Sequence, residues 1–199
     1  MNLWLRLIWL ALTQWRRPAL KTADDLSVLH FRVMPSDLDV SLHMNNSRYL
    51  ALMDLGRLDF LARVGLWPVV RRHRWTPIVS AIIIRYRREL RPFARFRLET
   101  RLVAWAEASV IMEQTFVHVG GRHAGQVAAR ALFKGGVYSR AERRFVDIPR
   151  MMAEIGVSAQ SPAWTPEIEA FLKADSALKV TAAGYGSQIE DAPVPTRYT

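Results

Sequence analysis

The sequence contains no cysteine, and this absence removes several chemistries at once. Disulfide bonds, thiolate metal sites and cysteine nucleophiles are all excluded, which is compatible with a reducing compartment. The five histidines show neither HxxxH nor HExxH spacing. We therefore expect no metal site in this protein.

Acidic residues are scarce relative to basic ones: 18 Asp and Glu stand against 28 Lys and Arg, which gives a formal net charge of +10. Such a balance suits nucleic acid, an anionic membrane face or a phosphate-bearing substrate such as a coenzyme A ester. The sequence has no glycine-rich phosphate loop, zinc finger or RNP-type aromatic signature. We therefore expect no specific nucleic-acid partner.

Long apolar runs are also missing. The apolar stretch from Leu3 to Leu12 is interrupted by Arg6 and is about half as long as the roughly 20 residues that a spanning helix needs. No A-x-A-like site follows it, as a secretory signal would require. Its tryptophans and trailing arginines favour an amphipathic helix in a membrane interface over residues 3–17. The alternative is a helix packed on its own domain or on a second subunit.

The composition, 50% hydrophobic and 23% charged over 199 residues, predicts one globular domain with flanking segments. We divide the chain into an N-terminal amphipathic segment (1–26), a folded domain (27–140) and a C-terminal helical extension with a tail (141–199). The expected location is the cytoplasm, either free or peripheral to the inner membrane face.

Hydrophobic periodicity predicts a strand, a long helix and then four antiparallel strands. "SVLHFRVMP" alternates in part and is the first strand, and the helix covers residues 47–64. Asp54 and Arg57 lie mostly off the apolar stripe and are expected to pair within the helix. One face of the helix is apolar and consists of Tyr49, Leu52, Met53, Gly56, Phe60 and Val64.

After a stop at Gly65, "VVRRHRW" is interpreted as a basic loop. The later strands are expected at 75–89, 93–105, 109–119 and 123–139, followed by two short helices. An antiparallel sheet with one helix inserted after its first strand would curl around that helix and bury its apolar face. The fold class predicted is therefore α+β.

The stretch "DLDVSLHMNNSRYL", residues 37–50, crowds hydrogen-bonding groups into the entry of the predicted helix. A helix entry needs only one or two side-chain caps, so most of these groups require a second explanation. One of Asn45, Asn46 and Ser47 is expected to be the N-cap. Asp37 is expected to be a turn or capping carboxylate.

The segment "PSDLDVSLHMNNSRYLALMDLGRLDF" resembles the signature of hotdog-fold acyl-CoA and acyl-ACP thioesterases, in the 4-hydroxybenzoyl-CoA thioesterase-like branch. It is most similar to a thioesterase-like subgroup with DLD followed by HMNN. The resemblance covers about residues 28–140. It implies a hotdog fold, in which an antiparallel sheet wraps around one long central helix.

The resemblance also implies site residues. In the hydroxybenzoyl-CoA type the second aspartate of the DxD pair is the catalytic carboxylate, ten residues before the helix tyrosine, and Asp39 stands ten residues before Tyr49. In the plant acyl-ACP enzymes Asp, Asn and His alternate at every second position. The matching residues here are Asp39, Ser41 and His43, so Ser41 departs from that pattern.

Thioester hydrolysis needs a carboxylate that attacks the carbonyl or deprotonates water, together with donors for the developing oxyanion. The free N–H groups of a helix N-terminus can supply those donors. We therefore expect hydrolysis of an acyl-CoA or acyl-ACP, with Asp39 as nucleophile or general base and His43 as its catalytic companion. No cofactor is expected beyond coenzyme A as part of the substrate. The expected substrate-binding residues are Asn45, Asn46, Ser47, Tyr49, Arg85 and Arg88.

The exposed strand edges of such a sheet predict a homo-oligomer, either a dimer or a tetramer. Two other functions stay open at this point. The first is a non-catalytic hotdog module that binds acyl chains or a membrane surface. The second is a basic membrane-surface or nucleic-acid-binding protein whose carboxylates are only structural.

Overall fold

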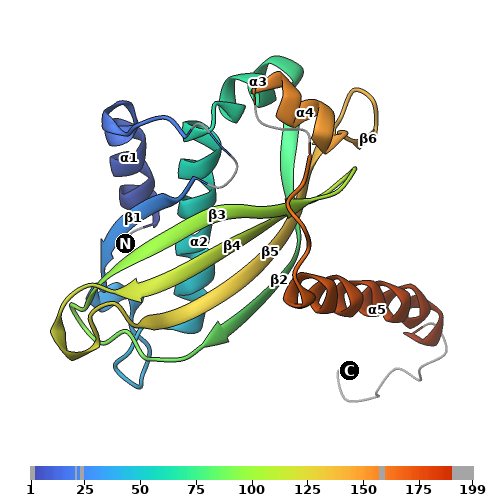
Figure 1. Cartoon of the computed structure of the whole chain (residues 1–199). Helices are drawn as coiled ribbons and strands as arrows, with labels where there is room; N and C mark the ends of the chain where they lie inside the picture. The colour runs from blue at the N-terminus through green and yellow to red at the C-terminus, as the bar shows by residue number, and fades with distance from the viewer. Residues whose placement is uncertain (1–2, 21, 23–24, 157–159, 190–199) are drawn as a thin grey trace, which may run out of the picture. The chain divides into compact units, whose positions relative to one another are not determined.

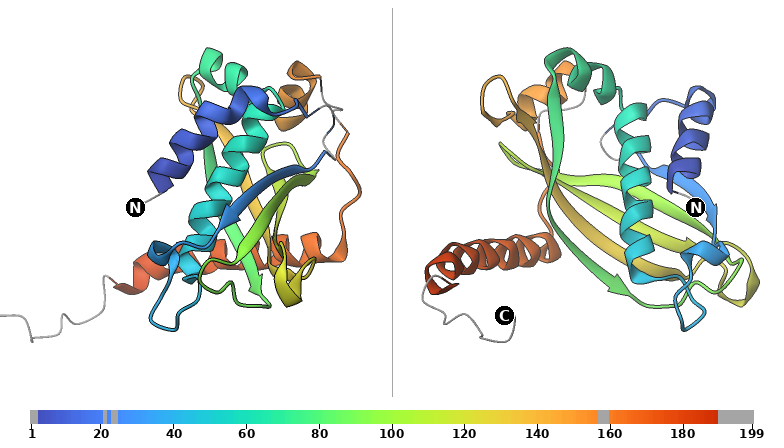
Figure 2. Two further views of the ribbon diagram at one scale, coloured as in Figure 1. Left: turned by 90° about the vertical axis from the view of Figure 1, so that its left-hand side faces the viewer. Right: turned by 180° about the vertical axis from the view of Figure 1, so that it is seen from behind.

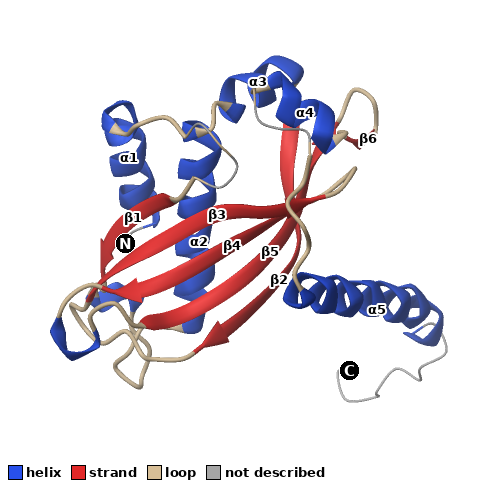
Figure 3. Ribbon diagram, viewed as in Figure 1, coloured by secondary structure: helices blue, strands red, loops and turns tan. Residues whose placement is uncertain are grey.

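The computed structural model describes residues 3–20, 22, 25–156 and 160–189. Contacts group the chain into two units, Met1–Ala163 and Trp164–Thr199. The first unit holds a sheet with four helices, and the second holds one helix, α5 (Pro166–Ile189) (Figure 3). The division at residues 26 and 140 stays a prediction. Among the described residues, no helix combines the length and the apolarity needed to cross a bilayer.

The sheet is antiparallel, with the strand order β1-β3-β4-β5-β2 and a short sixth strand on the end of β5 (Figure 1). β1 and β2 are consecutive strands but lie on opposite edges, so the helix between them crosses the width of the sheet. The predicted antiparallel sheet with one long helix after its first strand is therefore present. The strands are β1 (Ser27–Arg32), β2 (Trp75–Tyr86), β3 (Arg95–Trp105), β4 (Val110–His118), β5 (Val127–Ser139) and β6 (Arg144–Phe145).

The crossing helix, α2 (Asn46–Arg63), begins and ends where the sequence predicts. Asn45 is the N-cap, and its Oδ1 accepts a hydrogen bond from the N–H of Ser47 at 2.9 Å. The helix ends before Gly65, whose φ of +80° suits a residue without a side chain. All six residues of the predicted apolar stripe are buried. Arg57 forms the predicted pair with Asp54, although it is also buried, which the sequence did not indicate.

The other helices differ more from the expectations. Residues predicted as a basic loop form α3 (Leu66–His73), because Pro68 is tolerated in a first helical turn and Leu66, Val69 and Val70 bury one face. α4 (Ile148–Glu154) is a short helix, as predicted, and Asp147 is its N-cap. α5 has 24 residues and is not short. α1 (Leu3–Thr13) lies beside α2 in both views of Figure 2.

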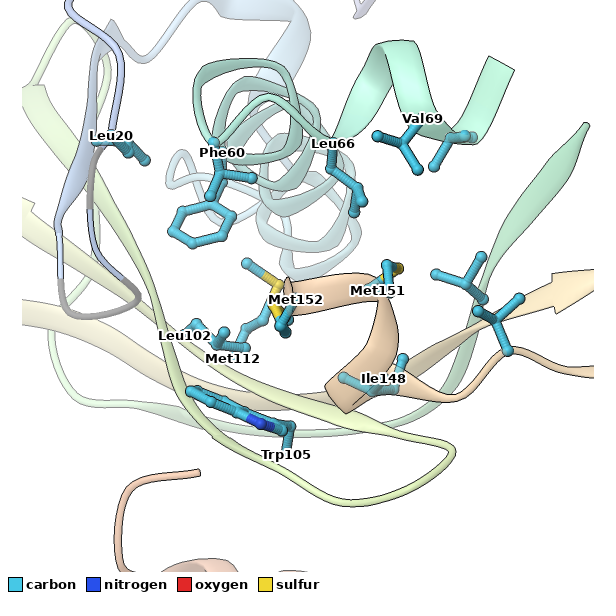
Figure 4. Close-up of a cluster of buried hydrophobic side chains, with 14 of the residues drawn as sticks. Leu20, Phe60, Leu66, Val69, Leu102, Trp105, Met112, Ile148, Met151 and Met152 are labelled. Atoms are coloured by element: carbon cyan, nitrogen blue, oxygen red, sulfur yellow. The ribbon is translucent and has the colours of Figure 1, made fainter. Parts of the chain in front are cut away.

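The buried side chains form two clusters along α2. One lies around its C-terminal half, where α3 and α4 close over the sheet (Figure 4). The other surrounds its N-terminal half and contains Tyr49 and Phe116, whose ring centroids are 4.8 Å apart. Between the two, Gly56 brings the helix backbone against the sheet. A Cβ at this position would lie 2.6 Å from Thr100 Oγ1 and 2.8 Å from Gln114 Nε2.

Replacing Gly56 with alanine should therefore destabilise the fold. In an open helix the same change would stabilise by about 1 kcal/mol, but here the added methyl group meets buried sheet side chains, and such overpacking costs about 1–3 kcal/mol. Urea unfolding of Gly56→Ala measures the change. Ala51→Gly in the same helix is the control, with a loss of about 1 kcal/mol from propensity alone. A Gly56→Ala protein as stable as the parent would contradict the close packing.

Candidate functional site

The segment from Asp37 to Asn45 is a tight loop fastened by its own backbone. The N–H of Asp39 donates to the carbonyl of His43 at 3.0 Å, and the N–H of Leu42 donates to the carbonyl of Asp39 at 3.1 Å. The N–H of Asn45 donates to the carbonyl of Asp37 at 2.8 Å. Leu42 completes the turn with a φ of +56°. The loop therefore presents residues 39–43 directly before the start of α2.

Asp39 and His43 meet in this loop. Oδ2 of Asp39 lies 3.3 Å from Nδ1 of His43, and the two side chains are 23% and 35% exposed. Oδ1 of Asp39 accepts a hydrogen bond from the N–H of Ser41 at 2.9 Å, which fixes the carboxylate to the turn. The structure thus brings the two predicted catalytic residues together. A partly exposed carboxylate beside an imidazole can attack a carbonyl or move a proton.

Asp37, two residues earlier, has a different environment. It is buried, and its Oδ2 accepts hydrogen bonds from Arg6 at 2.6 Å and from the N–H of Met34 at 2.9 Å. This arrangement matches the capping carboxylate expected from the sequence. The partner on α1, Arg6, was not indicated by the sequence.

The start of α2 offers one free backbone donor. The N–H of Ser47 is taken by the Asn45 side chain, and the N–H of Arg48 donates to the Asn45 carbonyl at 2.9 Å. Among the described residues, the N–H of Asn46 has no partner. The Ser47 hydroxyl also donates to Asn45 Oδ1, at 2.6 Å. The side chains of Asn46 and Ser47 are exposed beside the loop.

Tyr49 was expected to bind substrate, but the structure places its ring in the core. The ring lies edge-on to Tyr86, with centroids 5.0 Å apart, and to Phe116. Burial raises the pKa of Tyr49 far above its usual value, and the neighbouring Tyr86 adds to this effect. The ring of Tyr49 is therefore part of the core at the beginning of α2.

Arg85 and Arg88 are exposed at the end of β2 and just beyond it. In the described residues, no hydrogen bond or ion pair joins either side chain to Asp39 or His43. The charge of Arg88 contributes to the lowered pKa of His118, after burial as the main cause and the nearby His123 as the second. The Nε2 atom of His118 is buried without a partner among the described residues.

An apolar cavity of about 280 Å³ lies farther along α2. Phe60, Leu66, Leu102, Met112, Met151 and Met152, all labelled in Figure 4, line it. Its two charged lining residues are Asp54 and Arg57, which form an ion pair. None of the predicted site residues lines this cavity. Asp54 is eight residues beyond Asn46, or about 12 Å along a helix, so the cavity and the Asp39 loop are separate features of one chain.

Arg57 anchors the polar end of the cavity. Its guanidinium donates to Gln114 Oε1 at 2.8 Å and lies 4.3 Å above the ring of Phe133. Burial lowers the pKa of Arg57, although the neighbouring Asp54 opposes this. Two features of the sequence could have indicated the buried pair of Arg57 and Gln114. Arg57 follows Gly56 at the edge of the apolar stripe, and Gln114 is polar at a position of β4 where Met112 and Phe116 also point inward.

In the described part of the chain, no cluster of His, Asp and Glu side chains could hold a metal ion.

Comparison with known sequences identifies relatives of the folded region. A family model described as the thioesterase-like superfamily matches residues 33–156, which is more than half of the chain. Protein THEM6 of Danio rerio is 40% identical over 113 residues, 57% of this chain and 56% of that protein. Thioesterase lcsJ of Purpureocillium lilacinum is 24% identical over 127 residues, 54% of this chain and 41% of that protein. The chain spans about half the length of these curated relatives.

Solved structures share the fold at low sequence identity. YbaW from Escherichia coli is 24% identical, with a TM-score of 0.59 over 64% of this chain and 94% of that chain. Slr0204, a 1,4-dihydroxy-2-naphthoyl-CoA thioesterase from Synechocystis, is 11% identical, with a TM-score of 0.56 over 66% and 95%. SAV2348 from Staphylococcus aureus, solved in complex with CoA, is 12% identical, with a TM-score of 0.58 over 73% and 92%. The predicted hotdog architecture is confirmed, and the chain belongs to the thioesterase-like superfamily.

Proposed function

We propose that this protein hydrolyses an acyl thioester of coenzyme A or of an acyl carrier protein, and that Asp39 is the reacting carboxylate. The observation that carries the proposal is the pairing of a partly exposed Asp39 with His43, 3.3 Å apart, at the entry to a helix. Membership of the thioesterase-like superfamily supports the same reaction class.

In one route the Asp39 carboxylate attacks the thioester carbon, expels the thiolate and forms a mixed anhydride, which water then hydrolyses. In the other route Asp39 takes a proton from a water molecule that attacks the carbon. In both routes the C–S bond breaks, the acyl group leaves as the free acid, and the thiolate receives a proton. His43 can hold that proton beside the carboxylate. The free N–H of Asn46 is the donor available to the developing oxyanion. The exposed arginines Arg85 and Arg88 suit the phosphates of the coenzyme.

Substitutions of three aspartates test whether Asp39 is the reacting carboxylate. Asp39→Asn keeps the size of the side chain but removes its charge, so turnover of acyl-CoA should fall by about 10² to 10⁴ with little change in stability. Asp37→Asn should lose about 1.5–3 kcal/mol of unfolding free energy, because it loses charged hydrogen bonds to Arg6 and Met34. Its turnover should fall far less. Thiol release and urea unfolding measure the two effects.

Asp54→Asn is the matched control, because Asp54 is the carboxylate beside the cavity. Its turnover should stay within several-fold of the parent. His43→Ala should lower turnover by several-fold to about 10², as loss of a proton-holding group would. If Asp54→Asn abolishes turnover while Asp39→Asn retains it, the reacting carboxylate is at the cavity and the assignment to Asp39 is wrong.

The cavity favours a second function, binding of an acyl chain without hydrolysis. Its volume of about 280 Å³ is near the lower end of ligand pockets, and its lining is apolar except for the Asp54–Arg57 pair. A screen across acyl-CoA chain lengths separates the two functions. Thiol release for one class of chain supports the thioesterase, whereas saturable binding without release for any acyl-CoA or acyl-ACP supports the binding module.

We further propose that two copies associate through β2. This strand forms a free edge of the sheet and leaves apolar side chains in solvent, with Val79 and Ile83 about half exposed, at 48% and 51%. An open edge with exposed apolar groups is suited to pairing with a second chain.

Lysine on this edge should prevent that pairing. Val79→Lys combined with Ile83→Lys places two charges where the partner strand would pack, so a dimer should dissociate to a monomer of 22.8 kDa. Light scattering measures the mass. Leu178→Lys, an exposed leucine on α5, is the control and should leave the mass unchanged. A parent protein that is already monomeric would contradict the proposed association.

A further inference from the structure

The helix α1 is amphipathic in the reverse of the usual sense. A surface helix normally turns its apolar stripe toward the core and its charges toward water. Here Arg6, the one arginine of α1, faces the domain, and the outward face of the helix carries no charge. The exposed residues of that face are Trp4, Leu5, Ile8, Trp9 and Leu12, and Trp15 extends it just beyond the helix. Trp4 and Trp15 are each 76% exposed.

Specific contacts fix this rotation of the helix. Arg6 pairs with the buried Asp37 at 2.6 Å, and Leu10 on the same helix is buried. Just beyond the helix, Arg17 pairs with the fully buried Asp59 at 2.8 Å. Turning the apolar face inward would separate Arg6 from Asp37 and Arg17 from Asp59. Asp59 would keep Arg63, at 3.3 Å, but Asp37 would lose its ion pair, and loss of a charged partner is strongly unfavourable for a buried carboxylate. The outward apolar face is therefore a consequence of how the domain holds α1.

A continuous apolar face of this kind marks an interaction surface, and its chemistry fits a lipid bilayer. Tryptophan is favoured at the boundary between headgroups and acyl chains, and Trp15 lies beside the exposed Arg16, whose guanidinium is 4.7 Å from the ring. Residues 3–20 contain three arginines and no carboxylate, in a chain with a net charge of +10. Anionic headgroups complement this charge.

The neighbouring strand adds a basic rim to the same face. A shallow recess between α1 and β1 is lined by Leu5 and Trp9 from the helix and by His30 and Arg32 from the strand. A second copy of the chain is a poorer occupant, because the edge suited to self-association is β2, on the opposite side of the sheet from β1. The helix has 11 residues, about 16 Å, and so would lie in the plane of the interface.

We propose that α1 docks the protein on an anionic lipid surface through its outward apolar face, and that Arg6 on its inward face links this docking to the Asp39 loop. The link runs through Asp37, whose side chain binds Arg6 and whose carbonyl accepts from the N–H of Asn45. Arg6 is thus a positioning residue for the loop. Only the importance of this link for catalysis rests on the proposed thioesterase function.

Vesicle flotation tests the docking. The full-length protein should bind phosphatidylcholine vesicles that contain phosphatidylglycerol, and added salt should weaken this binding. The double variant Trp4→Ser with Trp15→Ser should bind at least about tenfold more weakly, because two exposed indoles no longer enter the interface. Trp67→Ser, which removes an exposed indole from α3, is the matched control and should bind like the parent.

Two results would overturn the docking. One is equal vesicle binding by the parent and the Trp4/Trp15 double variant. The other is a change of oligomeric mass in the double variant with no vesicle binding by the parent, which would assign the face to a second copy. Neither readout depends on hydrolysis, so a failure of the thioesterase proposal would leave this test intact.

Hydrogen exchange of the loop amides tests the link. In the parent, vesicles should slow the exchange of the N–H groups of Asp39, Leu42 and Asn45, since their bonds close the loop. Arg6→Gln should still bind vesicles but lose this protection, and Arg6→Lys should restore most of it. Protection that persists in Arg6→Gln, or loss of vesicle binding in that variant, would overturn the role of Arg6. If hydrolysis is found, Arg6→Gln should abolish the change in turnover that vesicles cause in the parent.

Discussion

The close approach of α2 to the sheet is the constraint on which the rest of the fold depends. At Gly56 the helix backbone comes so near that a methyl group would meet Thr100 and Gln114. Gln114 uses this proximity to donate to the carbonyl of Met53 at 2.9 Å and to accept from Arg57. Because these groups are buried, their hydrogen bonds are costly to break. These contacts fix the distance of the helix from the sheet and its position along its own axis. Its N-terminus is therefore fixed relative to the loop that precedes it.

The loop before α2 uses two aspartates, two residues apart, in different ways. Asp37 is buried and fully occupied by Arg6 and Met34, so it secures the base of the loop. Asp39 is partly exposed, holds the turn with one oxygen and meets His43 with the other. A rigid base and a partly open tip are what a reacting carboxylate requires, because its position must be fixed while its oxygen stays accessible.

Much of this arrangement follows from local patterns. The apolar stripe of α2, the cap at Asn45 and the later strands were predicted because period and capping chemistry are local properties. The helix α3 was missed because Gly65 and Pro68 also suit a loop, and only tertiary burial of the apolar residues between and after them decides the outcome. The burial of Arg57 was not predicted, because its partner Gln114 is 57 residues away in the sequence. The strand order and the cavity depend on such distant contacts, and no local pattern contains them.

The fixed helix also determines how the apolar cavity could change in size. One wall is α2, which Gln114 prevents from sliding by a turn, and another is the sheet. The remaining wall includes Met151 and Met152 of α4, a helix of only seven residues with flexible, unbranched side chains directed at the cavity. A larger ligand could therefore be accommodated by a shift of α4 or of its two methionine side chains. The side chains of Met151 and Met152 are thus the part of the cavity wall that the fixed helix and the sheet leave adjustable.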